Sequence, residues 1–353
     1  MSLSVISFTE VGIRLSEKIA EVWEGEEVLL FTRCTAARTG TAPSVRFAPQ
    51  SVGQWAREQM ERKNTLLFIG ACGIAVRAIA PYLTDKLHDS PVLVMDEKGT
   101  YVIPILSGHM GGANETAGQL ARRMGAIPVI TTATDLQGRF AVDLFAKKNG
   151  FRIENREGIA RVTARVLAGE EITMSVEDGH MEPDTTLPEG IRRIPYPPEQ
   201  FADLVITTEE GNFEAALLLR PGTHVIGMGC KRGKEAEEID AFIRESLREA
   251  GIESRQLLAL ASIDRKKEEE GLLAFCRKAD IPFYTYTARQ LQEVQGVFHA
   301  SAFVREQVGT DNVCERAALR ACGPGGELVY EKHARDGMTI AIARREWRIS
   351  FEK

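Results

Sequence analysis

Short apolar runs and amphipathic segments alternate along the N-terminal part of the chain. Ser4 to Phe8 and Glu27 to Thr32 are apolar runs typical of strands, and Glu10 to Trp23 between them has the period of an amphipathic helix. Thr35 to Pro49 is polar and predicts a loop. This order of strand and helix predicts an α/β fold that begins with a doubly wound layer structure.

The same alternation continues towards residue 130. A helix is expected over Ser51 to Lys63, and the apolar run Thr65 to Ile69 predicts a buried parallel strand that ends in the glycine turn Gly70 to Arg77. Tyr101 to Leu106 predicts another strand. The helix that follows it is expected to begin at or just after Ala113 and to end near Gly125.

The pattern weakens in the middle of the chain and then returns. Between Asp143 and Arg220, Gly158 to Leu167 predicts a helix, Glu171 to Val176 predicts a strand, and Pro183 to Pro198 is rich in proline. A second α/β alternation starts at His224. We therefore predict an N-terminal α/β domain at 1–140, a small irregular middle domain at 141–221 and a second α/β domain at 222–353.

The second alternation opens with an apolar strand that begins at His224 and ends in a glycine turn at Gly233. The further strands expected are Leu257 to Ser262, Ile281 to Tyr286, Glu327 to His333, Met338 to Ala343 and Trp347 to Phe351. The helices expected are Glu235 to Ala250 and Glu268 to Lys278, with helix starts at Ala300 to Arg305 and Val313 to Leu319.

Composition narrows the class of protein. With 353 residues, 44% hydrophobic and 27% charged, the chain is long enough for two or three globular domains. The net charge of −6 is spread without a basic block, which argues against nucleic acid as the main partner. We expect a cytoplasmic protein, because no apolar run reaches the roughly 20 residues of a membrane span and the N-terminus lacks a signal-peptide pattern. The six cysteines are scattered without a CxxC pair, so neither a disulfide framework nor a zinc site is expected.

Ser107 to Asn114 is the stretch with the strongest chemical character. Its three glycines let the backbone turn and expose N–H groups, and the helix that follows points the positive end of its dipole at the same loop. His109 titrates near neutrality, and Asn114 and Glu115 add an amide and a carboxyl group. An anion site is one interpretation, and an ordinary strand-to-helix turn with a surface histidine is the other.

Three loops could line one crevice if they all follow parallel strands. They are the Gly70 turn, the His109 loop, and Thr131 to Asp135 after the expected strand Ile127 to Ile130. With Arg77 they would form a lining suited to a ligand with many carboxylates. Cys72 at the first of these turns is more typical of a small buried hydrophobe than of a reactive thiol. Neither glycine turn is a dinucleotide fingerprint, and no Walker lysine motif occurs.

Two further candidates lie in the C-terminal part. Lys231 and Arg232 follow the strand that begins at His224, where a helix N-terminus also offers amides for an anion, although solvated surface cations are an equally simple interpretation. Cys314 and Glu315 form a thiol and carboxyl pair at a helix start, where a structural role is the simpler interpretation.

Six segments, in the same order along the chain, resemble the CbiG family of cobalamin-biosynthesis proteins, the cobalt-precorrin-5A hydrolases of the anaerobic corrin pathway. They are FIGACGIAVRAIAP (Phe68 to Pro81), LSGHMGGAN (Leu106 to Asn114), TTATD (Thr131 to Asp135), GMGCKRG (Gly227 to Gly233), VCERAAL (Val313 to Leu319) and GMTIAIAR (Gly337 to Arg344). The resemblance implies a C-terminal domain related to the corrin-pathway protein CobE.

The resemblance also implies an activity. A CbiG-like enzyme hydrolyses the ring A δ-lactone of cobalt-precorrin-5A and releases acetaldehyde, leaving cobalt-precorrin-5B. Cobalt arrives with the substrate, so we expect no protein-bound metal or cofactor. The substrate is then the expected partner, with neither nucleic acid nor membrane; a homodimer and contacts with neighbouring corrin-pathway enzymes are left open.

For this reaction we take His109 as the first candidate for the general base, and Glu115 and Asp135 as the next. The residues expected to bind substrate are Gly70, Cys72, Gly73, Arg77, Ser107, Gly108, Gly111, Gly112, Asn114, Thr131, Thr132, Thr134, Gly229, Cys230, Lys231, Arg232, Gly233, Cys314 and Glu315. Two other functions remain open: a non-catalytic carrier of a tetrapyrrole intermediate, and a nucleotide-dependent α/β enzyme, which the missing phosphate-binding patterns disfavour.

Overall fold

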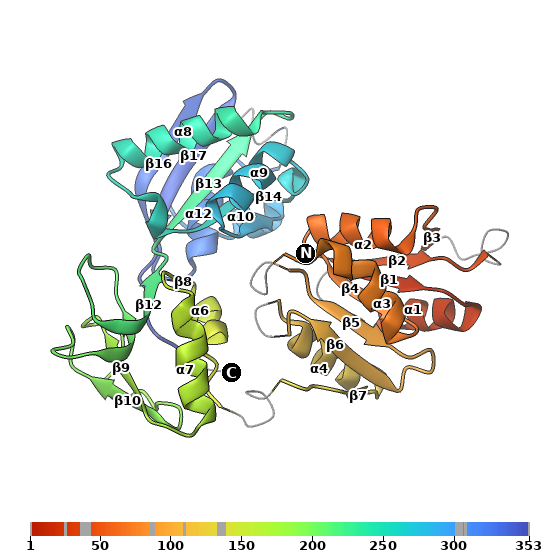
Figure 1. The fold of residues 1–353 in the computed structure, drawn as a ribbon. Helices are drawn as coiled ribbons and strands as arrows, with labels where there is room; N and C mark the ends of the chain where they lie inside the picture. The colour runs from red at the N-terminus through yellow and green to blue at the C-terminus, as the bar shows by residue number, and fades with distance from the viewer. Residues whose placement is uncertain are drawn as a thin grey trace. The chain divides into compact units, whose positions relative to one another are not determined.

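The computed structural model describes residues 2–24, 27–35, 44–84, 89–108, 111–132, 139–300, 306 and 309–351. The chain divides into two compact units, residues 1–144 and residues 145–353. The first unit holds one β-sheet and the second holds two (Figure 1). The α/β class predicted from the sequence is confirmed, and within the described ranges no helix is long and apolar enough to cross a lipid bilayer.

The first unit is built on a seven-stranded sheet with the order β3-β2-β1-β4-β5-β6-β7. Its strands are β1 (Leu3–Ser7), β2 (Val28–Thr32), β3 (Val45–Phe47), β4 (Thr65–Ile69), β5 (Val92–Met95), β6 (Tyr101–Leu106) and β7 (Ile127–Pro128). Its helices are α1 (Glu10–Val22), α2 (Val52–Glu61), α3 (Cys72–Ile79) and α4 (Ala113–Met124), with the 3₁₀ turn η2 (Ala80–Tyr82).

Both faces of this sheet are covered. The apolar sides of α1 and α4 pack on one face, against residues such as Val5 and Leu67. On the other face, α2 and α3 pack against Ile6 and Phe68, with Trp55 of α2 fully buried. Because neighbouring residues of a strand point to opposite faces, a strand buried on both sides has no polar alternation, which explains the continuous apolar run of β4.

The direction of the strands changes at β5. Strands β1 to β5 run parallel to one another, whereas β6 pairs with β5 antiparallel and β7 pairs with β6 parallel. The sheet is therefore mixed. No strand is predicted at β5, and β3 lies inside the loop expected over Thr35 to Pro49, so this reversal does not follow from the predicted elements.

The second unit begins with a five-stranded sheet of order β10-β9-β11-β12-β8. Its strands are β8 (Phe151–Ile153), β9 (Ile172–Val176), β10 (Ile191–Ile194), β11 (Ala202–Ile206) and β12 (Ala215–Pro221), with helix α7 (Glu157–Leu167). Helix α6 (Val142–Asn149) spans the division between the two units. α7 packs so closely on β12 that a Cβ atom on Gly158 would lie 2.1 Å from the carbonyl oxygen of Ala216. This region is thus more regular than expected.

The other sheet of the second unit has the order β15-β14-β13-β17-β16. Its strands are β13 (His224–Cys230), β14 (Leu257–Ile263), β15 (Phe283–Tyr286), β16 (Glu327–Arg335) and β17 (Met338–Arg344), and the first three run parallel. The helices are α8 (Ala236–Glu249), α9 (Glu270–Ala279), α10 (Ala288–Gln292) and α12 (Cys314–Cys322), with the 3₁₀ turns η3 (Ser254–Gln256) and η4 (Asp264–Lys266). α8 and α9 cover one face, and α10 and α12 cover the other.

The chain after β17 packs against the sheet formed by β8 to β12, which we call the middle sheet. The strand predicted over Trp347 to Phe351 is wrong, because these residues have no strand partner. Trp347 stacks on His180 at 3.8 Å, and Asn149 exchanges two hydrogen bonds with the backbone of Ser350. The alternation of buried and exposed side chains in this tail reflects one packed face rather than membership of a sheet.

Candidate functional site

The loop after β6 has a tightly constrained backbone. Ser107 adopts a left-handed conformation with φ 54°, which is rare for a residue with a side chain. The carbonyl oxygens of Ser107 and Gly108 accept hydrogen bonds from the amides of Ala113 and Asn114, both at 3.1 Å. These two hydrogen bonds join Ser107 and Gly108 to the first turn of α4.

Close contacts favour glycine at two positions of this loop, and the backbone conformation favours it at the third. A Cβ atom on Gly111 would lie 2.4 Å from Cβ of Ser107, and one on Gly108 would lie 2.7 Å from Oδ1 of Asn114. Gly112, the residue before α4, has φ 87° and has open space around it. Only glycine satisfies all three positions without strain.

Two of the three predicted loops lie together. Asn114 Nδ2 donates a hydrogen bond of 3.0 Å to Oγ1 of Thr132, which follows β7. Ser107 Oγ donates to the carbonyl oxygen of Asp89 at 2.8 Å, so the segment before β5 also borders this loop. Thr131 beside Thr132 is exposed.

Glu115 is the candidate base that the structure describes. It is exposed in the first turn of α4, and Gln119 Nε2 donates to its Oε1 at 3.4 Å. A carboxylate in the first turn of a helix is favoured by the helix dipole. The other two candidates, His109 and Asp135, lie outside the described residues, as does Thr134.

The Gly70 turn lies at the opposite edge of the sheet. Gly70 follows the carboxyl end of β4 and donates its N–H to Met95 at the carboxyl end of β5. β6 runs the other way, so its last residue, Leu106, pairs with Val92 at the start of β5. The prediction that the three loops share one crevice is therefore wrong for the Gly70 turn.

Polar and charged groups gather around the Gly70 turn itself. Cys72, the first residue of α3, is exposed rather than buried, and the guanidinium of Arg77 folds back to Gly73. Thr9 caps α1 at the same edge and donates to Glu97 at 2.6 Å. Thr9 and Glu97 are not recognised from the sequence, because only the order of β1, β4 and β5 brings them to this turn.

The loop after β13 carries the predicted cations. Lys231 and Arg232 are exposed, and Gly233 turns the chain with φ 77°. Cys230 before them is half-buried, and burial raises the pKa of its thiol. A Cβ atom on Gly229 would lie 2.7 Å from Oγ1 of Thr339, so β13 approaches β17 closely here.

Cys314 and Glu315 lie inside the second unit. Cys314 is 1% exposed, and burial raises the pKa of its thiol to about 11. Glu315 accepts hydrogen bonds from Nδ1 and the backbone N–H of His299 and from the backbone N–H of Lys332. Burial acts to raise the pKa of Glu315, but these hydrogen bonds outweigh it and the pKa is lowered. We interpret both residues as structural.

His299 is a residue that the sequence analysis misses. Its ring is 58% exposed, and the buried carboxylate of Glu315 holds Nδ1 at 2.8 Å. Only the tertiary fold brings it to Glu315, 16 residues further along the chain, so no local pattern indicates it.

Three family models match the chain in succession. They are the N-terminal region of cobalamin synthesis G at 54–135, the cobalamin-biosynthesis central region at 140–221, and the C-terminus of cobalamin synthesis G at 224–343. A cobalt-precorrin-5A hydrolase of Priestia megaterium is 32% identical over 96% of this chain and 94% of its own length. The chain belongs to the CbiG family. A cobalt-precorrin-5A hydrolase of Salmonella typhimurium is 30% identical over 97% of both chains.

The C-terminal part of this CbiG chain is also similar to a separate protein. Protein CobE of a Sinorhizobium species is 32% identical over 120 residues, which are 34% of this chain and 78% of that protein. The predicted likeness of the C-terminal domain to CobE is confirmed.

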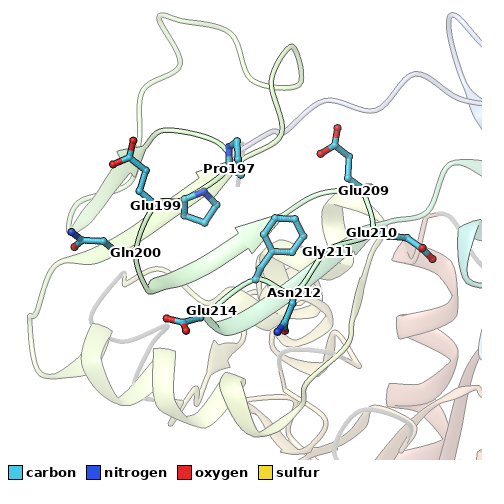
Figure 2. Close-up of a pocket in the computed structure, with 10 residues that line it drawn as sticks. Pro197, Glu199, Gln200, Glu209, Glu210, Gly211, Asn212 and Glu214 are labelled. Atoms are coloured by element: carbon cyan, nitrogen blue, oxygen red, sulfur yellow. The ribbon is translucent and has the colours of Figure 1, made fainter.

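A cavity of about 410 Å³ lies elsewhere, in the middle sheet region. Figure 2 shows Glu199, Glu209 and Glu214 around it. Phe213 also lines the cavity. Its acidic rim repels carboxylates, so its charge does not fit the ligand with many carboxylates that the sequence predicts. We therefore do not assign the substrate site to it.

Proposed function

We propose that this CbiG-family chain is a cobalt-precorrin-5A hydrolase that opens the ring A δ-lactone and releases acetaldehyde to give cobalt-precorrin-5B. The observation that carries the proposal is similarity over nearly the whole length to two proteins with this name, at 32% and 30% identity. Similarity over all three regions makes a shared activity a stronger inference than similarity of one domain would.

The first chemical step is attack of water on the lactone carbonyl. A general base removes a proton from the water; His109 is our first candidate, and Glu115 and Asp135 are the next. Glu115 supports this placement, since its carboxyl group is exposed beside the loop after β6.

The loop after β6 is suited to the charge that develops in this step. Attack turns the carbonyl oxygen into an oxyanion, which preorganised N–H groups stabilise. The amides of Ala113 and Asn114 already donate to Ser107 and Gly108, so we assign the oxyanion to the amides of the Gly111–Gly112 turn. The start of α4 adds the positive end of its dipole.

The second step breaks a carbon–carbon bond. Collapse of the tetrahedral intermediate frees the lactone oxygen on the bridging carbon as an alkoxide. The alkoxide becomes the carbonyl of acetaldehyde as the bond from this carbon to the ring breaks. The electron pair of that bond passes into the electron-poor cobalt macrocycle, which takes up a proton. Water supplies the atoms gained by the carboxylate product and the macrocycle, so the step needs no oxidant or reductant.

Anaerobic incubation of the purified protein with cobalt-precorrin-5A tests the proposal. We expect acetaldehyde, trapped as a hydrazone, in proportion to the macrocycle consumed, with many turnovers per protein and the matching loss of mass from the macrocycle. A heat-denatured sample is the control for spontaneous lactone opening. A macrocycle that binds but returns unchanged would overturn the hydrolase and favour the carrier of a tetrapyrrole intermediate. A melting temperature raised by millimolar nucleotide would favour the nucleotide-dependent enzyme.

A further inference from the structure

The loop from Lys231 to Lys234 joins β13 to α8 at the edge of the sheet where β13 and β14 end. It presents Lys231 and Arg232 to solvent. Among the residues that the structure describes, neither side chain forms a salt bridge. Exposed cations on a short loop bind carboxylates more tightly when the loop backbone is already held in the bound conformation.

One partly buried ion pair supports this loop. Lys266 Nζ lies 2.7 Å from Glu269 Oε2, and the two side chains are only 15% and 9% exposed. The other oxygen of Glu269 accepts the backbone N–H of Gly233 at 2.6 Å. One carboxylate therefore connects η4, which follows β14, to the turn of the cationic loop.

The loop is also held at its two ends. Lys231 donates its N–H to the carbonyl oxygen of Gly337 at 2.9 Å, and a Cβ atom on Gly337 would lie 2.7 Å from Cδ of Lys231. A Cβ atom on Gly271, in the first turn of α9, would lie 2.3 Å from the carbonyl oxygen of Lys234. The hydrogen bond that Gly233 donates to Glu269 lies between these two contacts along the loop.

A gain in stability does not explain why an ionised Glu269 lies beside this loop. Burial acts to raise the pKa of Glu269, but the hydrogen bonds from Lys266 and Gly233 outweigh it and the pKa is lowered, so the carboxyl group is ionised near neutral pH. Desolvation cancels much of what a buried ion pair gains, so such pairs contribute little to stability. A negative charge near Arg232 would also weaken the attraction of the loop for carboxylates.

We propose that Lys266 and Glu269 are positioning residues, which hold the Lys231–Gly233 loop in the conformation in which Lys231 and Arg232 bind carboxylate groups of the substrate. This proposal rests on the proposed function, because that function supplies a polycarboxylate ligand. Neither residue touches the reacting atoms. They order the loop. This ordering strengthens substrate binding more than the negative charge of Glu269 weakens it.

Glu269→Gln separates geometry from charge, because the two predict opposite signs. If the pair positions the loop, loss of the Lys266 contact raises KM and the dissociation constant for cobalt-precorrin-5A about tenfold, the value of one charge-assisted hydrogen bond, while kcat is nearly unchanged. If the loop attracts cobalt-precorrin-5A only through its positive electrostatic potential, removal of a negative charge near Arg232 lowers the dissociation constant. Lys266→Met, which breaks the pair from the other side, should match Glu269→Gln.

The matched control is Asp240→Asn. Asp240 pairs with Lys278 at 2.9 Å on the same face of the same sheet, 20% exposed and without a bond to the loop. It should leave KM and the dissociation constant unchanged. Thermal melting of each variant establishes that it folds.

A double-mutant cycle completes the test. In the Lys231→Ala, Arg232→Ala background, Glu269→Gln should change the dissociation constant less than about twofold, because the positioning pair then has no cations to place. Tighter binding by Glu269→Gln, or an equal loss with and without Lys231 and Arg232, would overturn the proposal. Calorimetric binding is read independently of acetaldehyde release, so wild-type protein that binds without turnover removes the hydrolase function and leaves this loop testable.

Discussion

Leu106, the last residue of β6, lies opposite Val92, the first residue of β5, in an antiparallel pair. This relationship reverses the direction of the sheet between the two glycine-containing turns. The loop after β6 therefore lies at the edge where β1 to β5 begin, and the Gly70 turn lies at the edge where they end. The chemistry that we assign to the loop after β6 is separated from Cys72 and Arg77 by the length of a strand.

The candidate bases give the first prediction. We expect His109→Ala to lower the turnover of cobalt-precorrin-5A about a hundredfold or more, the usual effect of losing a general base. Glu115→Gln and Asp135→Asn test the other two candidates by the same acetaldehyde assay. Glu10→Gln is the matched control for Glu115, because Glu10 is also an exposed acid in the first turn of a helix and should change nothing. Near wild-type turnover in all three candidate variants would contradict the mechanism.

The glycines of the loop after β6 give the second prediction. Gly111→Ala places a Cβ atom 2.4 Å from Cβ of Ser107. We expect a loss of about 1–3 kcal/mol in the free energy of unfolding, from forced strain in the loop, together with reduced turnover. Urea denaturation followed by circular dichroism measures the first effect.

Gly118→Ala provides the control, since Gly118 lies inside α4 and a Cβ atom there would lie 3.5 Å from Arg122. This change should stabilise the protein by about 0.5–1 kcal/mol, as expected for alanine in place of glycine within a helix. Equal stabilities of the two variants would show that the loop tolerates a side chain at Gly111.

β1 and β4 are predictable because each is a local apolar run that precedes a helix, and β4 also has a glycine turn behind it. β5 is not recognised, and the reversal at Leu106 depends on which strands pair, a property that periodicity does not contain. For the same reason, the sequence predicts one crevice for the loops of Asn114 and Thr132 and for the Gly70 turn. The first two loops are joined by a hydrogen bond, but the Gly70 turn lies at the other edge of the sheet. The contact between His299 and Glu315 is tertiary, so neither composition nor spacing reveals it.

His224 gives a prediction about pH. Its side chain is 8% exposed, and burial lowers the pKa of its imidazole to about 4, with Arg344 adding to the effect. Between pH 6.5 and about 4 the unfolded chain binds a proton that the folded protein does not. The contribution of His224 to stability is therefore complete above pH 6.5 and is lost as the pH falls towards 4, by up to about 3 kcal/mol.

His224→Asn should reduce this pH dependence, measured as the free energy of unfolding in urea at several pH values between 4 and 7. Asparagine keeps a polar atom near the position of Nδ1, which bonds Thr223 at 2.9 Å. His333→Gln is the control, because His333 is exposed and should leave the slope unchanged. An identical slope in wild type and His224→Asn would assign the acid sensitivity to other groups.

The tail after β17 gives the last prediction. Trp347 is 4% exposed, stacks on His180 and meets the edge of the Phe151 ring at 5.7 Å. Trp347→Ala should cost about 3–5 kcal/mol, because it empties a large buried site between the tail and the middle sheet. We expect proteolytic cleavage in the 145–221 region before the sheet formed by β13 to β17 is cut.

The control is Arg348→Ala, which removes a neighbouring exposed side chain that pairs with Glu182. A surface ion pair contributes at most about 1 kcal/mol. If both variants melt at the same temperature, the tail does not hold the middle sheet in place.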